Sequence, residues 1–388
     1  MDRSLMLLLT VATFAAAGGI HYQTPMLGPM AAEFGVGAAE IGWIPTATFG
    51  GFLAGIALLA PLGDRMDKRK LILRQHCACI VALLVAAAAP TLATAAAAGF
   101  VIGICGSTSQ SFIPLVAELS PPNQRGRGVS TILTAVFVGI LFARIVGGVV
   151  AAHLGWRWMY VIGAGMMIAI APVLFARLPH SAPKTSLSYP RLLASLWHLL
   201  AEHADMRRVL VIQILLGICY GGFWATIATM LLKFHGLGPQ VAGLIAIPGA
   251  AGILITRPAG RWVDLRGAAP IVRAGIALMF AAYAAFALGL WWPAALAVGA
   301  AILDCGLRAT LVANQTTVNS LAPDARSRSN TVFGVSVWSG NALGAFLASL
   351  ALAHSGWLAV CALSAVAAAT ALGVQLISMR GYPARSRR

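Results

Sequence analysis

The chain has 388 residues, of which 59% are hydrophobic and 10% are charged, and its formal net charge is +16. A soluble domain carries about 25% charged residues, so this composition excludes an ordinary water-soluble globular protein. The positive charge would suggest nucleic acid in a soluble protein, but here it lies between apolar stretches of membrane-spanning length, and we expect no nucleic-acid partner.

Apolar runs of roughly 20 residues recur along the chain, each long enough to cross a hydrocarbon core of ~30 Å. We expect helices, because the runs lack the alternation of barrel strands and lipid leaves no backbone group unpaired. The pattern predicts twelve spans, near residues 4–26, 40–60, 71–90, 94–117, 129–152, 158–177, 208–232, 241–258, 270–290, 294–320, 330–353 and 357–379.

The first of these runs also has features of a secretory signal, with Arg3, an apolar stretch and Ala15-Ala16-Ala17. We interpret it as a retained helix, because a tandem repeat in the sequence requires the first span to match the seventh.

That repeat is visible when the chain is aligned with itself at a shift of roughly 201 positions. The pairs are Phe34–Gly37 with His235–Gly238, Asp64 with Asp264, Leu119-Ser120-Pro121 with Leu321-Ala322-Pro323, and Gly155-Trp156 with Gly356-Trp357. A shift this constant indicates one ancestral half copied in tandem.

The basic residues indicate the orientation of the spans. Nearly all of them lie in alternate segments between spans, and the other set holds only Arg157 and Lys233. By the positive-inside rule, both termini and the central loop are expected in the cytoplasm. We therefore expect an integral protein of the plasma (inner) membrane that contacts lipid.

A proline-containing stretch at residues 178–207 separates the two copies and reads as a linker with a short amphipathic helix around Tyr189–His203. The predicted domains are a bundle over 1–177, the cytoplasmic linker over 178–207, and a bundle over 208–388. Because each half has six spans, both halves have the same orientation, and a solute site is expected between them.

The loop after the second span, Ala60-Pro61-Leu62-Gly63-Asp64-Arg65-Met66-Asp67-Lys68-Arg69-Lys70, resembles the major facilitator superfamily signature Gly-x-x-x-Asp-Arg-x-Gly-Arg-Arg. Ala60 and Asp67 replace its two glycines. The resemblance implies an all-α membrane protein with twelve transmembrane helices in two pseudo-symmetric six-helix bundles. It also implies a cytoplasmic gate at Asp64, Arg65, Arg69 and Asp264. The alternative, charge that only sets topology, explains the basic residues but not an acid repeated at Asp64 and Asp264.

The fifth span reads Gly139-x-x-x-Ala143-Arg144-x-x-Gly147-Gly148, which resembles the antiporter signature Gly-x-x-x-Gly-Pro-x-x-Gly-Gly of the drug and metabolite exporters. Small residues at this spacing allow close helix approach. Arg144 stands where the signature has proline, which weakens the implied antiport.

One acidic residue, Asp304, lies in the middle of a predicted span, with Arg308 one turn later and Gln315 nearly in line. A charge at bilayer depth costs at least about 2.5–3.5 kcal/mol, so it rarely persists without a task. A shift of 202 maps Asp304 to Ile102, so the repeat does not require the charge. Asp304 and Arg308 either face a cavity, where Asp304 couples solute to protons, or form a buried pair that fixes packing.

In the family that the chain resembles, the first, fourth, seventh and tenth spans surround the cavity. On these spans the candidates for contact with solute are His21, Tyr22, Gln23, Thr108, Gln110, Tyr220 and Trp224, besides Arg144, Arg308 and Gln315. For each polar residue taken alone, helix packing is the better explanation.

We therefore expect a secondary transporter of a small organic solute that works by alternating access, with proton-coupled efflux as the leading hypothesis. A proton-linked importer of a carboxylate or sugar-like metabolite is the alternative. A receptor or a membrane enzyme is disfavoured, because no catalytic or phosphate-binding motif is present. We expect a functional monomer without cofactor or metal, driven by the proton gradient.

Overall fold

The computed structural model describes residues 2–121, 124–181, 188–322 and 325–380, and within these ranges it contains helices and turns without strands. Eleven helical segments are long and apolar enough to cross a membrane, and the shorter apolar helix Arg3–Gly19 lies at the position of the predicted first span. The twelve-span, all-helical prediction is confirmed.

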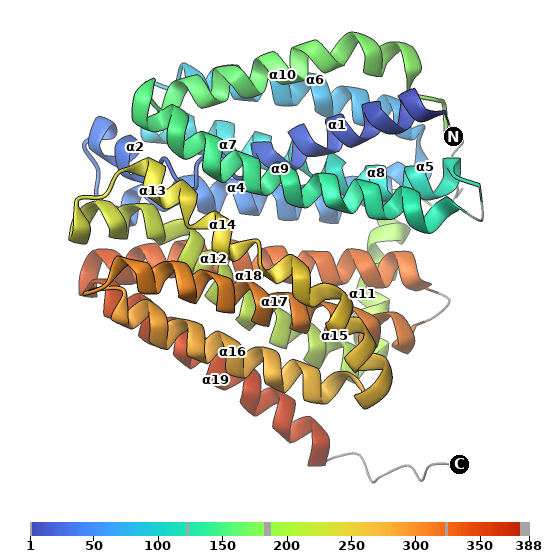
Figure 1. Ribbon diagram of the computed structural model, residues 1–388. Coiled ribbons are helices and arrows are strands. Elements are labelled where there is room, and N and C mark those ends of the chain that lie inside the picture. Colours follow the sequence, from blue (N-terminus) through green and yellow to red (C-terminus); the bar gives the residue numbers. More distant parts are fainter. Residues whose placement is uncertain (1, 122–123, 182–187, 323–324, 381–388) are drawn as a thin grey trace. The chain divides into compact units, whose positions relative to one another are not determined.

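The helices, most of which are labelled in Figure 1, follow the predicted order. In the first sequence half they are α1 (Arg3–Gly19), α2 (Leu27–Phe34), α3 (Ala38–Ile41), α4 (Trp43–Ala54), the π-helix η1 (Gly55–Leu59), α5 (Ala60–Arg65), α6 (Lys68–Ala87), α7 (Leu92–Gly106), α8 (Thr108–Leu119), α9 (Arg125–His153) and α10 (Trp156–Arg177). Helix α11 (Tyr189–Glu202) occupies the stretch where the amphipathic helix is predicted.

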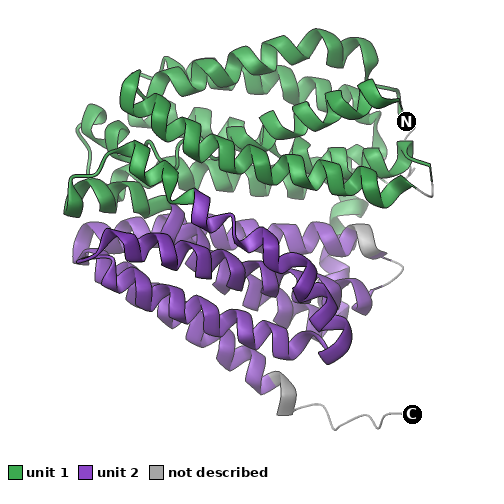
Figure 2. Cartoon of the chain, viewed as in Figure 1, with its two compact units in different colours: residues 1–194, 225–246 green, residues 195–224, 247–388 purple. Residues whose placement is uncertain are grey.

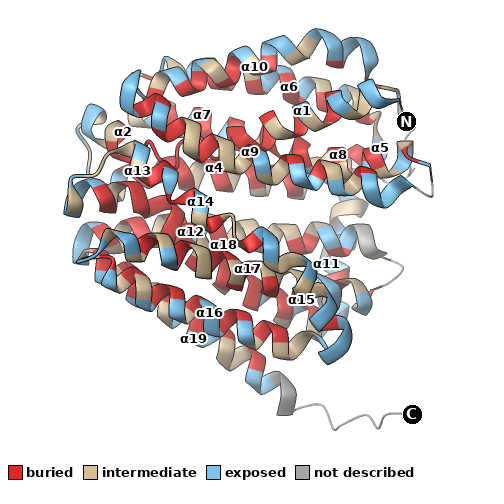
Figure 3. Ribbon diagram, in the orientation of Figure 1, coloured by how far each residue is buried: buried red, intermediate tan, exposed pale blue. Residues whose placement is uncertain are grey.

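The second half contains α12 (Ala204–His235), α13 (Pro239–Leu244), α14 (Ala246–Gly249), α15 (Gly252–Arg266), α16 (Ala268–Leu288), α17 (Pro293–Leu321), α18 (Arg326–Ser355) and α19 (Trp357–Arg380). Apolar side chains dominate these helices, and in Figure 3 the long helices carry both buried and exposed segments.

Packing divides the chain into two compact units, shown in Figure 2. The first unit comprises Met1–Ala194 and Ala225–Ala246, and the second comprises Ser195–Trp224 and Ile247–Arg388. The predicted domain boundaries follow the sequence repeat, whereas these units follow packing. They differ because the end of α12 and all of α13 pack in the first unit.

Four of the five positive backbone φ angles in the described residues follow the repeat, and Gly267 is the fifth. Gly35 and Gly236 have φ of 65° and 64°, and Gly155 and Gly356 have φ of 93° and 78°. Each pair is related by the shift found in the sequence. A left-handed residue of this kind ends a helix or turns the chain, and glycine adopts it without steric cost. The glycine pairs recognised in the sequence therefore mark the same turns in both copies.

Close helix packing repeats as well. A Cβ atom added to Gly139 of α9 would collide with the carbonyl oxygen of Phe14 in α1, and one added to Gly340 of α18 would collide with that of Ile214 in α12. The four residues are pairwise related by shifts of 200 and 201. Backbones this close explain why small residues occupy the antiporter-like segment.

Several predicted spans are interrupted. After α1 ends at Gly19, residues 20–26 form successive turns before α2 begins, with i→i+3 bonds such as Thr24 N–H to the His21 carbonyl at 3.2 Å. Pro25 lacks an N–H group and disfavours helical geometry at the residue before it. The first span therefore breaks at its polar residues.

Candidate functional site

The acid in the tenth span is buried inside the second unit. Asp304 of α17 is 4% exposed, and its Oδ1 accepts a hydrogen bond from the Tyr220 hydroxyl of α12 at 3.4 Å. A buried carboxylate is costly unless polar groups compensate it. Two candidates chosen from the sequence are thus neighbours in the structure.

The chain between α14 and α15, where the helical span is interrupted, lies beside this carboxylate. A Cβ atom added to Gly249 would lie 3.1 Å from Asp304 Oδ2 and 3.3 Å from Trp224 Cζ2, and one added to Gly252 would lie 2.8 Å from the Asp304 backbone. The glycines therefore let α17 approach the broken span closely. Interrupted helices with polar groups beside them are characteristic of solute and ion sites in transporters.

Trp224 belongs to an aromatic cluster that holds this region in place. It is 1% exposed, and its ring lies 6.2 Å from that of Tyr220 and 5.0 Å from that of Phe223. Phe223 stacks on Phe286 at 4.0 Å. These contacts fix the orientation of α12, so that Tyr220 and Trp224 both lie beside Asp304.

A second polar contact joins the same two helices. The Asn314 side-chain amide of α17 donates to Gln213 Oε1 of α12 at 3.2 Å, and both residues are buried. Neither residue is among the candidates chosen from the sequence. Gln213 lies two turns from Tyr220 on one helix face, and that spacing could have indicated it.

The other candidates of α17 lie nearer to its C-terminal end. Arg308 is half-buried one turn after Asp304. Gln315 is exposed and donates to Asn330 of α18 at 3.3 Å. With a helical rise of 1.5 Å per residue, Gln315 lies roughly 16 Å along the axis from Asp304, and so it is not part of the group around the carboxylate.

In the first unit, His21, Tyr22 and Gln23 are buried within the turns between α1 and α2. Their side chains diverge. The His21 ring lies 5.9 Å from Phe49, Tyr22 packs 6.3 Å from Tyr160, and Gln23 donates to the Ile20 carbonyl at 2.8 Å. The structure therefore does not gather these three side chains at one point.

Thr108 is buried at the start of α8, directly after the interruption at Ser107, whereas Gln110 is exposed. The interruption has a polar neighbour that was not predicted from the sequence. Gln75 of α6 donates to Ser107 Oγ at 3.2 Å and to the Ile104 carbonyl at 3.3 Å. Backbone carbonyls and hydroxyls that a broken helix exposes need such partners.

Arg144 is buried in α9 within the first unit, at 4% exposure. A Cβ atom on Gly243 of α13 would collide with the Arg144 carbonyl, and one on Gly148 would collide with that of Pro239. The antiporter-like segment therefore packs backbone to backbone against residues 239–243 of the second sequence copy.

The predicted gate residues lie at helix ends. Arg65 and Asp264 are exposed, and the side chain of Asp64 lies outside the described part of the structure. The contacts of this loop include residues that were not predicted from the sequence. Lys68 forms an ion pair with Glu118 at 2.7 Å, and Asp67 contacts the chain after α10.

Comparison with known proteins agrees with this architecture. The family model described as the Major Facilitator Superfamily matches residues 9–324. The "Uncharacterized transporter YgaY" of Escherichia coli O157:H7 is 30% identical over 98% of this chain and 96% of its own. A "Multidrug resistance protein B homolog" of Mycobacterium tuberculosis is 24% identical, covering 83% of this chain and 71% of its own.

Among solved structures, a point mutant of the nucleoside transporter NupG superposes with a TM-score of 0.82 at 15% identity, covering 98% of this chain and 100% of its own. At this identity the likeness concerns the fold. The match of the family model, together with the relative aligned over nearly its full length, also shows the family. The chain belongs to the major facilitator superfamily and is a membrane transporter rather than an enzyme.

Proposed function

We propose that this transporter exports a small organic solute by proton-coupled antiport, with Asp304 as the group that binds the proton. The observation that carries the proposal is the buried Asp304 beside Tyr220, Trp224 and the interrupted span α14–α15. A carboxylate at membrane depth is the usual carrier of protons in transporters.

One comparison favours export over import. The M. tuberculosis relative bears the name of a multidrug resistance protein.

The mid-span charges narrow the class of solute. They comprise one acid, Asp304, and two arginines, Arg144 and Arg308. A net positive charge among these groups repels cations, so neutral polar or anionic molecules are favoured over lipophilic cations.

The direction can be tested in inside-out vesicles. A thermal-shift screen of the purified protein against metabolites and drugs first identifies a ligand that stabilises it. With that ligand labelled and the vesicle lumen acidified, an exporter that exchanges solute for protons accumulates the ligand inside. An importer that carries both together would empty the vesicles, and that result would replace antiport by symport.

The role of Asp304 is tested by substituting Asn, which keeps the shape of the side chain and cannot release a proton. We expect accumulation driven by the pH gradient to fall by roughly tenfold or more, equivalent to about 1.4 kcal/mol, whereas exchange of labelled for unlabelled solute continues. Asp205→Asn, at a half-exposed acid that pairs with Arg208 at 2.9 Å, is the matched control.

A further inference from the structure

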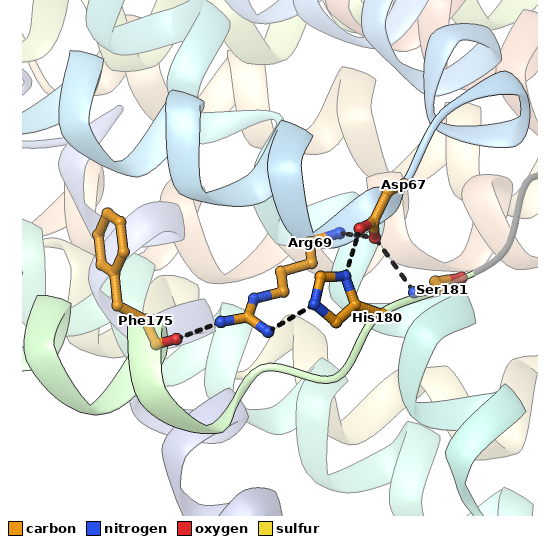
Figure 4. A network of polar contacts seen from close by, with 5 residues as sticks. All are labelled: Asp67, Arg69, Phe175, His180 and Ser181. Carbon is orange, nitrogen blue, oxygen red and sulfur yellow. Dashed lines mark hydrogen bonds and ion pairs between the residues drawn. The ribbon is translucent and has the colours of Figure 1, made fainter.

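A polar network joins the start of α6 to the residues that follow α10, all within the first unit (Figure 4). Asp67 Oδ1 accepts hydrogen bonds from the backbone N–H groups of Arg69 at 3.0 Å and Ser181 at 3.1 Å. Its Oδ2 lies 2.7 Å from His180 Nδ1. Both oxygens of one carboxylate thus hold the first residues of the central linker.

Arg69 binds the same segment from the other side. Its guanidinium donates to the Phe175 carbonyl at 2.6 Å and lies 3.0 Å from His180 Nε2. A guanidinium has no acceptor atom, so Nε2 must accept. In a neutral ring, Nδ1 then carries the proton, and its N–H group donates a hydrogen bond to Asp67. This arrangement fits a neutral imidazole with its proton on Nδ1.

The repeat shows that the fold does not need the acid. Helix α16 is the counterpart of α6, and its N-cap is Gly267, without a side-chain cap. The residues after it are Ala268, Ala269 and Pro270, none of which is charged. The second copy begins its helix without any of these ionic groups, so the acid at Asp67 has a task that only the first copy requires.

Charged neighbours on the adjoining elements do not compete for this ring. Lys68, next to Asp67, pairs with Glu118 at 2.7 Å. Arg177, at the end of α10, lies 3.8 Å from Asp2 and donates to Ser4. Asp67 and Arg69 are thus the ionic groups that face His180 among the described contacts.

We propose that Asp67, Arg69 and His180 form a proton-sensitive latch, here called the linker latch, that fastens the start of the central linker to the predicted gate loop. While His180 is neutral, the loop arginine Arg69 is held against the linker. Protonation removes the lone pair on Nε2 and brings two positive groups together, so Arg69 loses its bond to His180 and keeps the one to the Phe175 carbonyl, while Asp67 keeps its bonds to His180 and Ser181. Acidification thereby removes one of the two contacts that hold Arg69 against this segment, whether or not Asp304 carries the transported proton.

The ring state is tested by nitrogen NMR of the full-length protein labelled with ¹⁵N at histidine, with His180→Gln to assign the signal. At about pH 8, where an ordinary imidazole is neutral, we expect the proton on Nδ1. In Asp67→Asn, which can still cap α6, the ring should lose this preference for Nδ1. A proton on Nε2 in the parent protein at about pH 8 would overturn the proposal.

The attachment of the linker to Asp67 is tested by the hydrogen-exchange rate of the Ser181 amide, with each variant's rate corrected for its intrinsic exchange rate. Asp67→Ala removes its acceptor, and we expect exchange to quicken by roughly tenfold. His180→Ala should quicken Ser181 but leave the Arg69 amide protected by Asp67, which separates the latch from the helix cap. Asp205→Ala is the control that should change neither. Unchanged Ser181 exchange in Asp67→Ala would show that no latch exists.

Discussion

The free-energy cost of burying a carboxylate among apolar helices is offset by the few polar groups that contact it. One donor to Asp304 is the Tyr220 hydroxyl, at 3.4 Å, which is long for an O–H···O bond. The aromatic ring of Tyr220 contributes packing besides this bond. Its two contributions can therefore be separated by mutation.

Tyr220→Phe removes the hydroxyl and keeps the ring. We expect a modest loss of stability, about 0.5 kcal/mol, at the lower end for a hydrogen bond because of the distance. Thermal unfolding of purified protein measures it. Tyr220→Ala should cost several times more, since it also removes the contact with Trp224; equal losses in both variants would contradict this separation.

A different ionic group lies at the opposite end of the first unit from the gate loop. Glu33 accepts hydrogen bonds from Arg157 and from Trp156 Nε1, the latter at 2.6 Å, and Arg157 also donates to the Ala89 carbonyl at 2.9 Å. The hydrogen bond from Arg157, which slight burial opposes and Trp156 reinforces, lowers the pKa of Glu33. The carboxylate is thus favoured in the folded protein.

The lowered pKa of Glu33 determines how its contribution to stability changes with pH. A lowered folded-state pKa means that Glu33 stabilises the fold above the ordinary glutamate pKa of about 4.3, and that this contribution is lost as the pH falls through the folded value. We expect Glu33→Gln to lower the melting temperature at neutral pH. The difference from the parent should shrink as the pH approaches about 3. A constant difference would exclude the ionised group as its cause.

Glycines decide how closely helices approach at the Asp304 site. In the first unit Gly51 of α4 packs on the backbone of Phe100 in α7, and in the second unit its counterpart Gly252 packs on that of Asp304 in α17. The two glycines are related by the shift of 201, and each lets its helix approach the backbone of a neighbouring helix, although Phe100 is not the residue that the repeat aligns with Asp304. Only the second copy has a carboxylate beside this glycine. The first copy packs its helices closely without one, so close packing does not require the acid.

Substituting these glycines tests the packing. Gly252→Ala brings a Cβ atom to 2.8 Å from the Asp304 backbone, and overpacking of this kind costs about 1–3 kcal/mol. Gly260→Ala, in the same helix with open space around it, should be neutral or slightly stabilising, by up to about 1 kcal/mol. Melting temperatures of the two variants, measured in one detergent, should therefore move apart. If both fall alike, the close approach of α15 and α17 is wrong.

The sequence predicted the number of spans and the repeat, and it singled out Asp304, Tyr220 and Trp224, which are neighbours in the structure, because hydropathy, constant spacing and rare charges are local signals. It did not predict Gln213 with Asn314, or Asp67 with His180. Such pairs depend on how each helix is rotated about its axis and on which loops meet, and both are set by packing between distant segments. The break in the first span after Gly19 was also not predicted, although Pro25 was a local signal for it.

The two copies differ in their polar groups at two places. The first copy carries Asp67 at the start of α6, whereas the second has Gly267 and alanines at that point. The second copy carries the mid-span acid, whereas the first does not. This chain thus combines one repeated scaffold with different polar groups in each copy.

Central to this account is that solute movement and proton movement are linked through Asp304. Purified protein in liposomes that contain a pH-sensitive dye tests it most directly, with the stabilising ligand from the screen added outside and no imposed gradient. We predict that adding ligand changes the internal pH with the parent protein and with Asp205→Asn, but not with Asp304→Asn. Ligand entry into liposomes of the parent protein without any pH change, or an unaltered pH change in Asp304→Asn, would contradict it.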